Sequence, residues 1–157
     1  MRKRLITSTA ESISAREESW LDVEREAMVE VTSEDKDYPI ESALGTGDTR
    51  GWRAGGPGTQ TIRLLFDQPQ RIKRIALEFE ESEMARTQEF VLLWSADGGG
   101  PLKQIVRQQW NFSPPETKRE VEEYQVELSG VTVLELVIKP NIGGGDTRAS
   151  LKNFRLS

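Results

Sequence analysis

The sequence contains neither cysteine nor histidine. Without cysteine there can be no disulfide framework, no thiol nucleophile and no thiolate zinc site. Without histidine the chain lacks the most common general base at neutral pH and the most common ligand of transition metals. These two absences remove most routes to transition-metal binding and to nucleophilic catalysis.

Long hydrophobic runs are absent too. The basic start, residues 1–4, is not followed by the apolar run that a secretory signal requires. No stretch approaches the roughly 20 apolar residues of a membrane span. We therefore expect a cytoplasmic protein without membrane contact. The net charge of −5 disfavours binding along a nucleic-acid backbone, because such binding requires a concentrated positive face.

Residue patterns typical of enzymes are weak. Ser95 has no histidine partner, so a serine triad is excluded. Carboxylate pairs such as Asp35 and Asp37 lie in hydrophilic runs, which are usually solvated faces. The glycine runs at 98–100 and 143–145 lack the lysine and helix that follow in phosphate-binding loops. We expect a protein that is not an enzyme and has no catalytic residues.

Short apolar segments alternate with turn residues along most of the chain. The most informative one runs from Phe90 to Gly98, where an apolar strand containing Trp94 ends in a Ser-x-Asp-Gly turn. Several segments alternate apolar and polar residues, with one slip between Ile72 and Ile75 that suggests a bulge. Strands are predicted at 28–33, 61–66, 71–79, 89–95, 102–110, 121–128, 132–138 and 150–156. Eight short strands predict an all-β, single-domain sandwich or barrel with Trp94 in its core.

We divide the chain into an N-terminal arm, residues 1–27, and a β-sandwich domain, residues 28–157. Two capping-box patterns favour a helix in the arm, whereas Leu21 and Val23 are also compatible with an edge strand. In either case Trp20 is expected to anchor the arm to the domain.

One loop, residues 39–58, is rich in glycine, proline, aspartate and threonine and exceeds ordinary connections in length. Long loops on a rigid sandwich are common places for binding sites. The tetrapeptide Gly-Asp-Thr-Arg occurs in it at 47–50 and again at 145–148. Ordinary turn chemistry is sufficient to explain this repetition.

Taken together, the segments from residue 28 onward resemble the discoidin, or factor V/VIII type C, family. Its members share a galactose-binding-like jelly-roll sandwich with family 32 carbohydrate-binding modules. The likeness is carried by the order and spacing of the segments Val29–Glu34, Arg50–Arg53, Phe90–Gly98, Leu134–Ile138 and Ala149–Leu156. The resemblance implies a jelly roll of about eight antiparallel strands whose end loops bind a ligand.

Many members of that family hold a structural calcium ion through an Asp-Gly loop and a glutamate on the last strand. In this chain the glutamate position corresponds to Asn153, and only Asp48 remains as a weak candidate ligand. One carboxylate is a poor substitute for the six to eight oxygens that calcium prefers. We therefore expect no metal and no cofactor, and little effect of a chelator on thermal stability.

The candidate ligand-binding residues combine flat aromatic rings with hydrogen-bonding side chains, as a sugar site requires. They are Trp52, Arg53, Trp110, Asn111, Phe112 and Arg148. The alternative interpretation is that Trp52 and Trp110 only close the rim of the sandwich. If the chain binds a ligand, we expect it at the end that carries residues 46–56, 110–115 and 143–148.

These observations predict a non-catalytic binding module, with carbohydrate binding through the end loops as the first hypothesis. The absence of a signal segment favours the alternative of an intracellular protein-interaction module with a protein ligand. A third, less favoured hypothesis is binding of DNA ends, because Trp52-Arg53-Ala54 resembles part of a single-strand-break repair scaffold of the same fold.

The third hypothesis has a specific requirement. It would be favoured by a positive stripe formed by Arg50, Arg53, Arg63 and Arg148.

Overall fold

The computed structural model describes residues 20–45, 50–96 and 100–157. Within these ranges the chain is mostly strand, and its only helices are short. The elements are α2 (Val23–Glu26), β1 (Ala27–Val31), α3 (Glu41–Leu44), β2 (Trp52–Pro57), β3 (Gln60–Glu80), β4 (Arg86–Ala96), β5 (Lys103–Phe112), β6 (Arg119–Lys139), β7 (Arg148–Leu151) and β8 (Asn153–Leu156). The predicted all-β class is confirmed.

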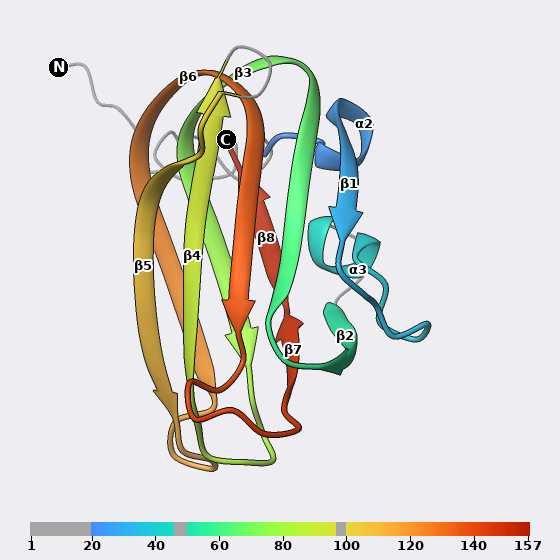
Figure 1. The fold of residues 1–157 in the computed structure, drawn as a ribbon, viewed down its shortest axis with the longest axis vertical. Coiled ribbons are helices and arrows are strands. Elements are labelled where there is room, and N and C mark those ends of the chain that lie inside the picture. The colour runs from blue at the N-terminus through green and yellow to red at the C-terminus, as the bar shows by residue number, and fades with distance from the viewer. Residues whose placement is uncertain (1–19, 46–49, 97–99) are drawn as a thin grey trace, which may run out of the picture.

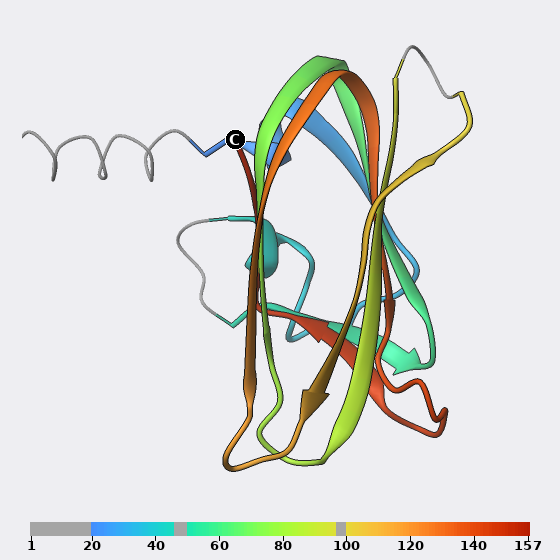
Figure 2. The same ribbon diagram turned by 90° about the vertical axis from the view of Figure 1, so that its left-hand side faces the viewer.

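Two long strands, β3 and β6, organise the fold. Each has 21 residues, and they pair antiparallel from Gln60 opposite Ile138 to Glu80 opposite Arg119. Both strands arch over one end of the molecule, so each contributes one half to either layer of the sandwich (Figure 2).

The remaining strands complete a jelly-roll sandwich (Figure 1). One layer contains β1, half of β3, half of β6, β4 and β5, in that order, and β8 pairs with the other half of β3. A separate antiparallel ribbon is formed by β2 and β7.

The predicted segment 150–156 is divided between β7 and β8, which belong to different sheets. The other predicted segments correspond to the observed strands with two differences. First, four predicted segments are the halves of β3 and β6, because the bends are made within the strands. The predicted slip in β3 is confirmed by a register shift between Ile72 and Arg74, which lets both Ile72 and Ile75 point into the core. Second, β2 lies inside the predicted loop 39–58. Its Gly55-Gly56-Pro57 sequence has low β propensity, so the pattern did not indicate a strand.

The core fills the space between the layers with aliphatic and aromatic side chains. Phe79 and Phe90 come from opposite layers and stack with their ring centroids 5.3 Å apart. Trp94, which was predicted to be in the core, is only half-buried. It lies near the end of β4, where the Lys103 ammonium is 5.3 Å from its ring centroid. The fully buried tryptophan is Trp52 instead, with 1% of its surface exposed.

Residues 20–27 pack against the domain and extend it. The Trp20 ring lies 3.9 Å from the Arg74 guanidinium, in agreement with the predicted anchor. Leu21 donates its backbone N–H to the Leu156 carbonyl at 2.7 Å, and Val23 and Ala27 belong to the core. The folded unit therefore begins before residue 28, whereas the earlier part of the predicted arm lies outside the described residues. None of the helices in the described ranges has the length and apolar character needed to cross a bilayer.

The two ends of the sandwich differ. The bends of β3 and β6 form the upper end in Figure 1, and the connections at 81–85, 113–118 and 140–147 gather at the lower end. The candidate site lies beside this lower end, which we call the loop end.

Candidate functional site

A cavity of about 390 Å³ opens between the β2–β7 ribbon and the end of β3. This volume is within the range of small-molecule sites. Its lining is mostly polar and comes from segments that are distant in sequence. The lining residues are Tyr38, Arg50, Trp52, Arg53, Glu80 to Glu83, Lys118, Arg148, and Ser150 to Lys152.

The ribbon determines which side chains reach this cavity. In β2, successive side chains point to opposite faces, so Trp52 and Ala54 are buried while Arg53 is exposed. Arg53 lies opposite Ser150 of β7 in the register of the two strands. The ribbon requires glycine at position 51, where φ is 80° and an added Cβ would lie 2.7 Å from the Leu151 carbonyl oxygen.

Tyr38 supplies an aromatic ring to the cavity and is held by a compact turn. Asp35 accepts a hydrogen bond from the Asp37 N–H at 2.9 Å, a typical aspartate turn. The Tyr38 carbonyl then accepts from the Arg53 N–H at 3.1 Å, and the Asp35 N–H donates to the Arg53 carbonyl at 2.8 Å. The turn is therefore tied to β2, and the half-buried Tyr38 ring lies beside Arg53.

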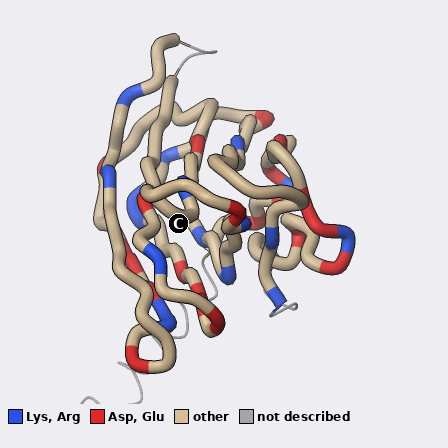
Figure 3. The backbone as a smooth tube through the Cα atoms, turned by 60° about the horizontal axis from the view of Figure 1, so that its bottom comes forward, with Lys and Arg blue, Asp and Glu red and all other residues tan. Residues whose placement is uncertain are grey.

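Basic side chains outnumber acidic ones around the cavity, although the whole chain is acidic. Lys152 pairs with Glu80 at 3.5 Å. For Arg53, Lys118 and Arg148, the described residues supply no side-chain hydrogen bond or ion pair. Figure 3 shows basic and acidic residues interspersed along the chain, so this excess is local.

Three of the six sequence-predicted residues meet at the cavity: Trp52, Arg53 and Arg148. Trp52 is buried and donates its indole N–H to the Ser33 carbonyl at 3.1 Å, so its ring belongs to the core and cannot stack on a ligand. Arg50 and Arg148, which end the two Gly-Asp-Thr-Arg repeats, both line the cavity. That repetition was therefore a usable signal.

The other three predicted residues lie on β5 and do not line the cavity. Phe112 is 1% exposed, with the Arg86 guanidinium 4.7 Å from its ring centroid. Trp110 is half-buried against the core, and the exposed Asn111 accepts a hydrogen bond from the Thr87 hydroxyl at 2.6 Å. The sequence suggested an aromatic loop here, but the strand continues through Phe112 and turns its ring inward.

Among the lining residues that the sequence reasoning missed, Tyr38 and Lys118 matter most for the chemistry of the cavity. Tyr38 lies before the glycine-rich part of the loop, and Lys118 lies within a charged run that resembles ordinary surface. Their position becomes evident only when the strands bring these segments to the ribbon.

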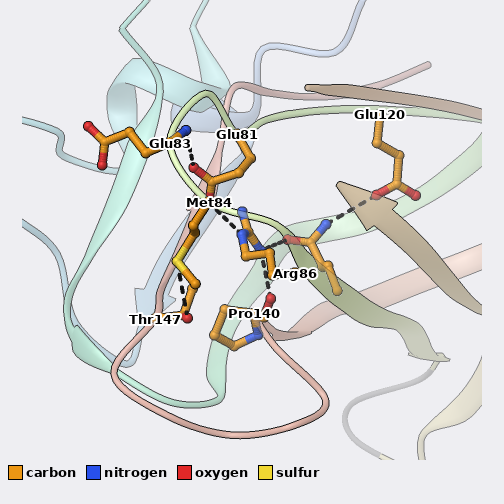
Figure 4. A network of polar contacts seen from close by, with 8 residues as sticks. Glu81, Glu83, Met84, Arg86, Glu120, Pro140 and Thr147 are labelled. Carbon is orange, nitrogen blue, oxygen red and sulfur yellow. Dashed lines mark hydrogen bonds and ion pairs between the residues drawn. The ribbon is translucent and has the colours of Figure 1, made fainter. Parts of the chain in front are cut away.

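A buried polar network supports the loop end beside the cavity (Figure 4). The Arg86 side chain is 1% exposed and donates to Glu81 at 2.6 Å, to Gln88 at 3.2 Å and to the Pro140 carbonyl at 2.7 Å. Gln88 in turn donates to Glu120 at 3.1 Å. Arg86 therefore joins the 81–85 connection, which lines the cavity, to the 140–147 connection that leads into β7.

The two carboxyl groups of this network have opposite pKa shifts. Burial acts most strongly, to raise the pKa of Glu81, but the hydrogen bond and charge of Arg86 together with the backbone N–H groups of Glu83 and Met84 outweigh it, and the pKa is lowered. Burial raises the pKa of Glu120 to about 8, with a further contribution from the neighbouring Glu122 carboxylate. One Glu120 oxygen has no hydrogen-bond partner among the described residues, so protonation removes a negative charge that no donor stabilises at that atom.

Glu120 should therefore make stability depend on pH. Its folded-state pKa lies above the ordinary value of 4.5, so the native state retains a proton that the unfolded chain releases. Its contribution to stability is lost as pH rises from about 4.5 to about 8. Glu120→Gln should remove this loss and be more stable than the wild type at pH 9, by up to about 5 kcal/mol for a shift from 4.5 to about 8 at about 1.4 kcal/mol per pKa unit. Urea unfolding at pH 5 and pH 9 measures the difference.

The matched control is Glu127→Gln, an exposed carboxylate on the same strand. It should follow the wild type at both pH values. Parallel behaviour of Glu120→Gln and the wild type would contradict the shift.

Metal binding was not expected. Residues 20–45, 50–96 and 100–157 contain no group of three or more carboxylates that could hold a metal ion. Asn153 donates its side-chain amide to Glu78 at 3.3 Å, and Asp48 lies outside the described residues. The expected insensitivity to a chelator stays a prediction.

Comparisons with known proteins identify the fold but no sequence relative. No protein-family model matches the chain, and no curated protein matches it in sequence. Among solved structures, the family 32 carbohydrate-binding module of NanJ from C. perfringens, in complex with galactose, is 13% identical with a TM-score of 0.63. The alignment covers 87% of this chain and 96% of that one.

Two other similar structures represent different contexts of the same fold. The family 32 module of AlyQ, in complex with 4,5-unsaturated mannuronic acid, is 14% identical with a TM-score of 0.59, over 83% of this chain and 93% of that chain. XRCC1, in its reduced form bound to the DNA polymerase β catalytic domain, is 17% identical with a TM-score of 0.60. That alignment covers 85% of this chain and 95% of the XRCC1 chain. The chain has the galactose-binding-like jelly-roll fold of the discoidin domains and family 32 carbohydrate-binding modules.

Proposed function

We propose that this chain is a non-catalytic carbohydrate-binding module that holds a sugar in the cavity between the β2–β7 ribbon and the end of β3. The observation that carries this proposal is the convergence of Tyr38, Arg53 and Arg148 on one cavity of about 390 Å³. An aromatic ring can stack on a pyranose, and guanidinium groups donate to hydroxyl oxygens. The fold supports the proposal, because several of its known members are named as carbohydrate-binding modules.

The cavity chemistry also favours binding over hydrolysis. Glycoside hydrolysis uses a carboxylic acid that protonates the leaving oxygen, paired with a second carboxylate. Here Glu80 pairs with Lys152, and Arg86 holds Glu81 ionised with a lowered pKa. With its lowered pKa, Glu81 is not suited to donate a proton at neutral pH.

Tyr38→Ala should weaken saccharide binding about tenfold, because it removes the stacking ring and leaves the rest of the cavity in place. Tyr38→Phe should retain most of the affinity, since the ring remains. Titration calorimetry against a panel of oligosaccharides measures the dissociation constants, and circular dichroism melting curves check the folding of each variant. Equal affinity of wild type and Tyr38→Ala for every saccharide bound would place the sugar elsewhere.

Protein interaction is the second candidate. Within the described ranges β5 pairs only with β4, so its other edge presents backbone groups to which a partner strand could add. The XRCC1 structure, with its bound polymerase domain, is an instance of the fold in a protein complex. This candidate would be preferred if no saccharide bound and a purified partner protein slowed amide exchange along β5.

DNA-end binding receives less support. Arg63, which belonged to the proposed positive stripe, instead pairs with Glu135 at 2.6 Å and with Glu30 at 3.0 Å. Arg50, Arg53 and Arg148 share the cavity. Three glutamates line it too, so the cavity is not a uniformly basic face.

A further inference from the structure

We propose that the cavity selects acidic sugars, and that Arg53, Lys118 and Arg148 hold the carboxylate of a uronic acid residue. This inference rests on the proposed function and specifies its ligand class. The three cations enter from different parts of the fold: Arg53 from β2, Lys118 from the connection before β6, and Arg148 from the start of β7.

The first argument is that the described residues supply no ion pair to these three cations, although all three line one cavity. Arg63, Arg74 and Arg119 each form an ion pair with a glutamate of a neighbouring strand. Within the described structure, no such pair involves the three cavity cations. Like charges that share one concave site repel each other, and an anionic ligand relieves that repulsion.

The second argument is the geometry of the donors. Guanidinium groups present two parallel N–H donors that match the two oxygens of a carboxylate, whereas a lysine ammonium acts as a point charge. Arg53 and Arg148 lie on paired strands, which fixes their spacing along the ribbon, and Tyr38 is tied to the Arg53 backbone. The cavity therefore places groups that can donate hydrogen bonds to a carboxylate next to a ring that can stack on the same sugar.

The third argument is that the acidic residues around the cavity disfavour polyanions of high charge density. Glu80, Glu81 and Glu83 also line the cavity. They would repel the closely spaced phosphates of a nucleic acid, and the net charge of −5 adds to this repulsion. A saccharide with one carboxylate per ring can place that group at the cations and neutral hydroxyls near the glutamates.

Matched pairs of oligosaccharides test the inference. Oligomers of galacturonic, mannuronic and glucuronic acid are titrated by calorimetry beside the neutral oligomers of galactose, mannose and glucose. We expect at least one acidic oligomer to bind at least tenfold more tightly than its neutral match. Arg53→Gln and Arg148→Gln should each reduce that preference severalfold, whereas Arg148→Lys should retain part of it.

The control is Arg71→Gln, which removes the same charge from an exposed site near the β3 bend, where Arg71 pairs with Glu127 at 3.5 Å. This variant should keep the full preference for the acidic oligomer. Because Arg53 and Arg148 are exposed, their variants should also keep the wild-type melting temperature.

The outcomes separate this inference from the proposed function. Binding of neutral and acidic oligomers with equal affinity would overturn the acidic-sugar inference and leave carbohydrate binding intact. Absence of binding to every saccharide would overturn both. Tight binding of a single-stranded oligonucleotide, lost steeply between about 50 and 200 mM salt, would overturn the inference in favour of phosphate recognition.

Discussion

Replacing Trp52 with alanine is expected to lower the free energy of unfolding by about 3 to 5 kcal/mol. The ring is 1% exposed and packs in the core beneath the cavity, so its removal leaves a void between β2 and the sandwich. The substitution also deprives the Ser33 carbonyl of the indole N–H donor at 3.1 Å. Urea denaturation followed by circular dichroism measures the loss.

Trp52→Phe separates the two contributions, because it retains most of the apolar volume but removes the N–H. It should cost less than half as much as the alanine variant. The matched comparison is Trp94→Ala, which removes the same side chain from a half-buried site and should cost less. If Trp52→Ala and Trp94→Ala were equally destabilising, Trp52 would not have the special place in the core that its burial indicates.

The second large effect is expected for Arg86→Met, which should destabilise the fold by about 3 to 5 kcal/mol. Methionine fills much of the arginine volume but leaves the Glu81 carboxylate, the Gln88 amide oxygen and the Pro140 carbonyl without their donor. A buried charge that loses its partner is costly because nothing replaces its hydration. Chemical denaturation at neutral pH provides the measurement.

A second substitution should repair part of this damage. The double variant Arg86→Met/Glu81→Gln removes the orphaned charge as well and should be more stable than Arg86→Met alone. As the control, Arg107→Met breaks the ion pair with Glu89 at an exposed position, and a change below about 1 kcal/mol is expected there. A comparable loss for Arg86→Met and Arg107→Met would mean that burial does not strengthen the Arg86 network.

Most of the sandwich could be predicted from local patterns. Alternating apolar residues identified both halves of β3 and of β6, and the slip between Ile72 and Ile75 indicated a real register shift. What the alternation could not indicate was that each pair of segments is one continuous strand. That continuity depends on the pairing of the two long strands, in which the bend of β3 lies opposite the bend of β6.

The site was less predictable, for a physical reason. Whether an aromatic ring in a strand points inward depends on register, and a shift of one position moves it to the other face. Trp52 and Phe112 were candidate ligand-binding residues, and both rings point inward. Arg53 and Arg148 could be found, because arginine in a polar loop is exposed in almost any arrangement.

The Arg86 network was beyond the reach of sequence reasoning. Its partner carbonyl belongs to Pro140, and Gln88 meets Glu120 across the interior, so all the pairings depend on the tertiary fold. In the sequence Arg86 is simply one more charged residue in a hydrophilic run.

The arching of β3 and β6 has a consequence for how the molecule can come apart. Because each long strand runs through both layers, a single backbone hydrogen-bond ladder extends around the sandwich. An opening that begins in one layer must either stop at the bend or propagate into the other. The sandwich is therefore better regarded as one cooperative unfolding unit than as two stacked sheets.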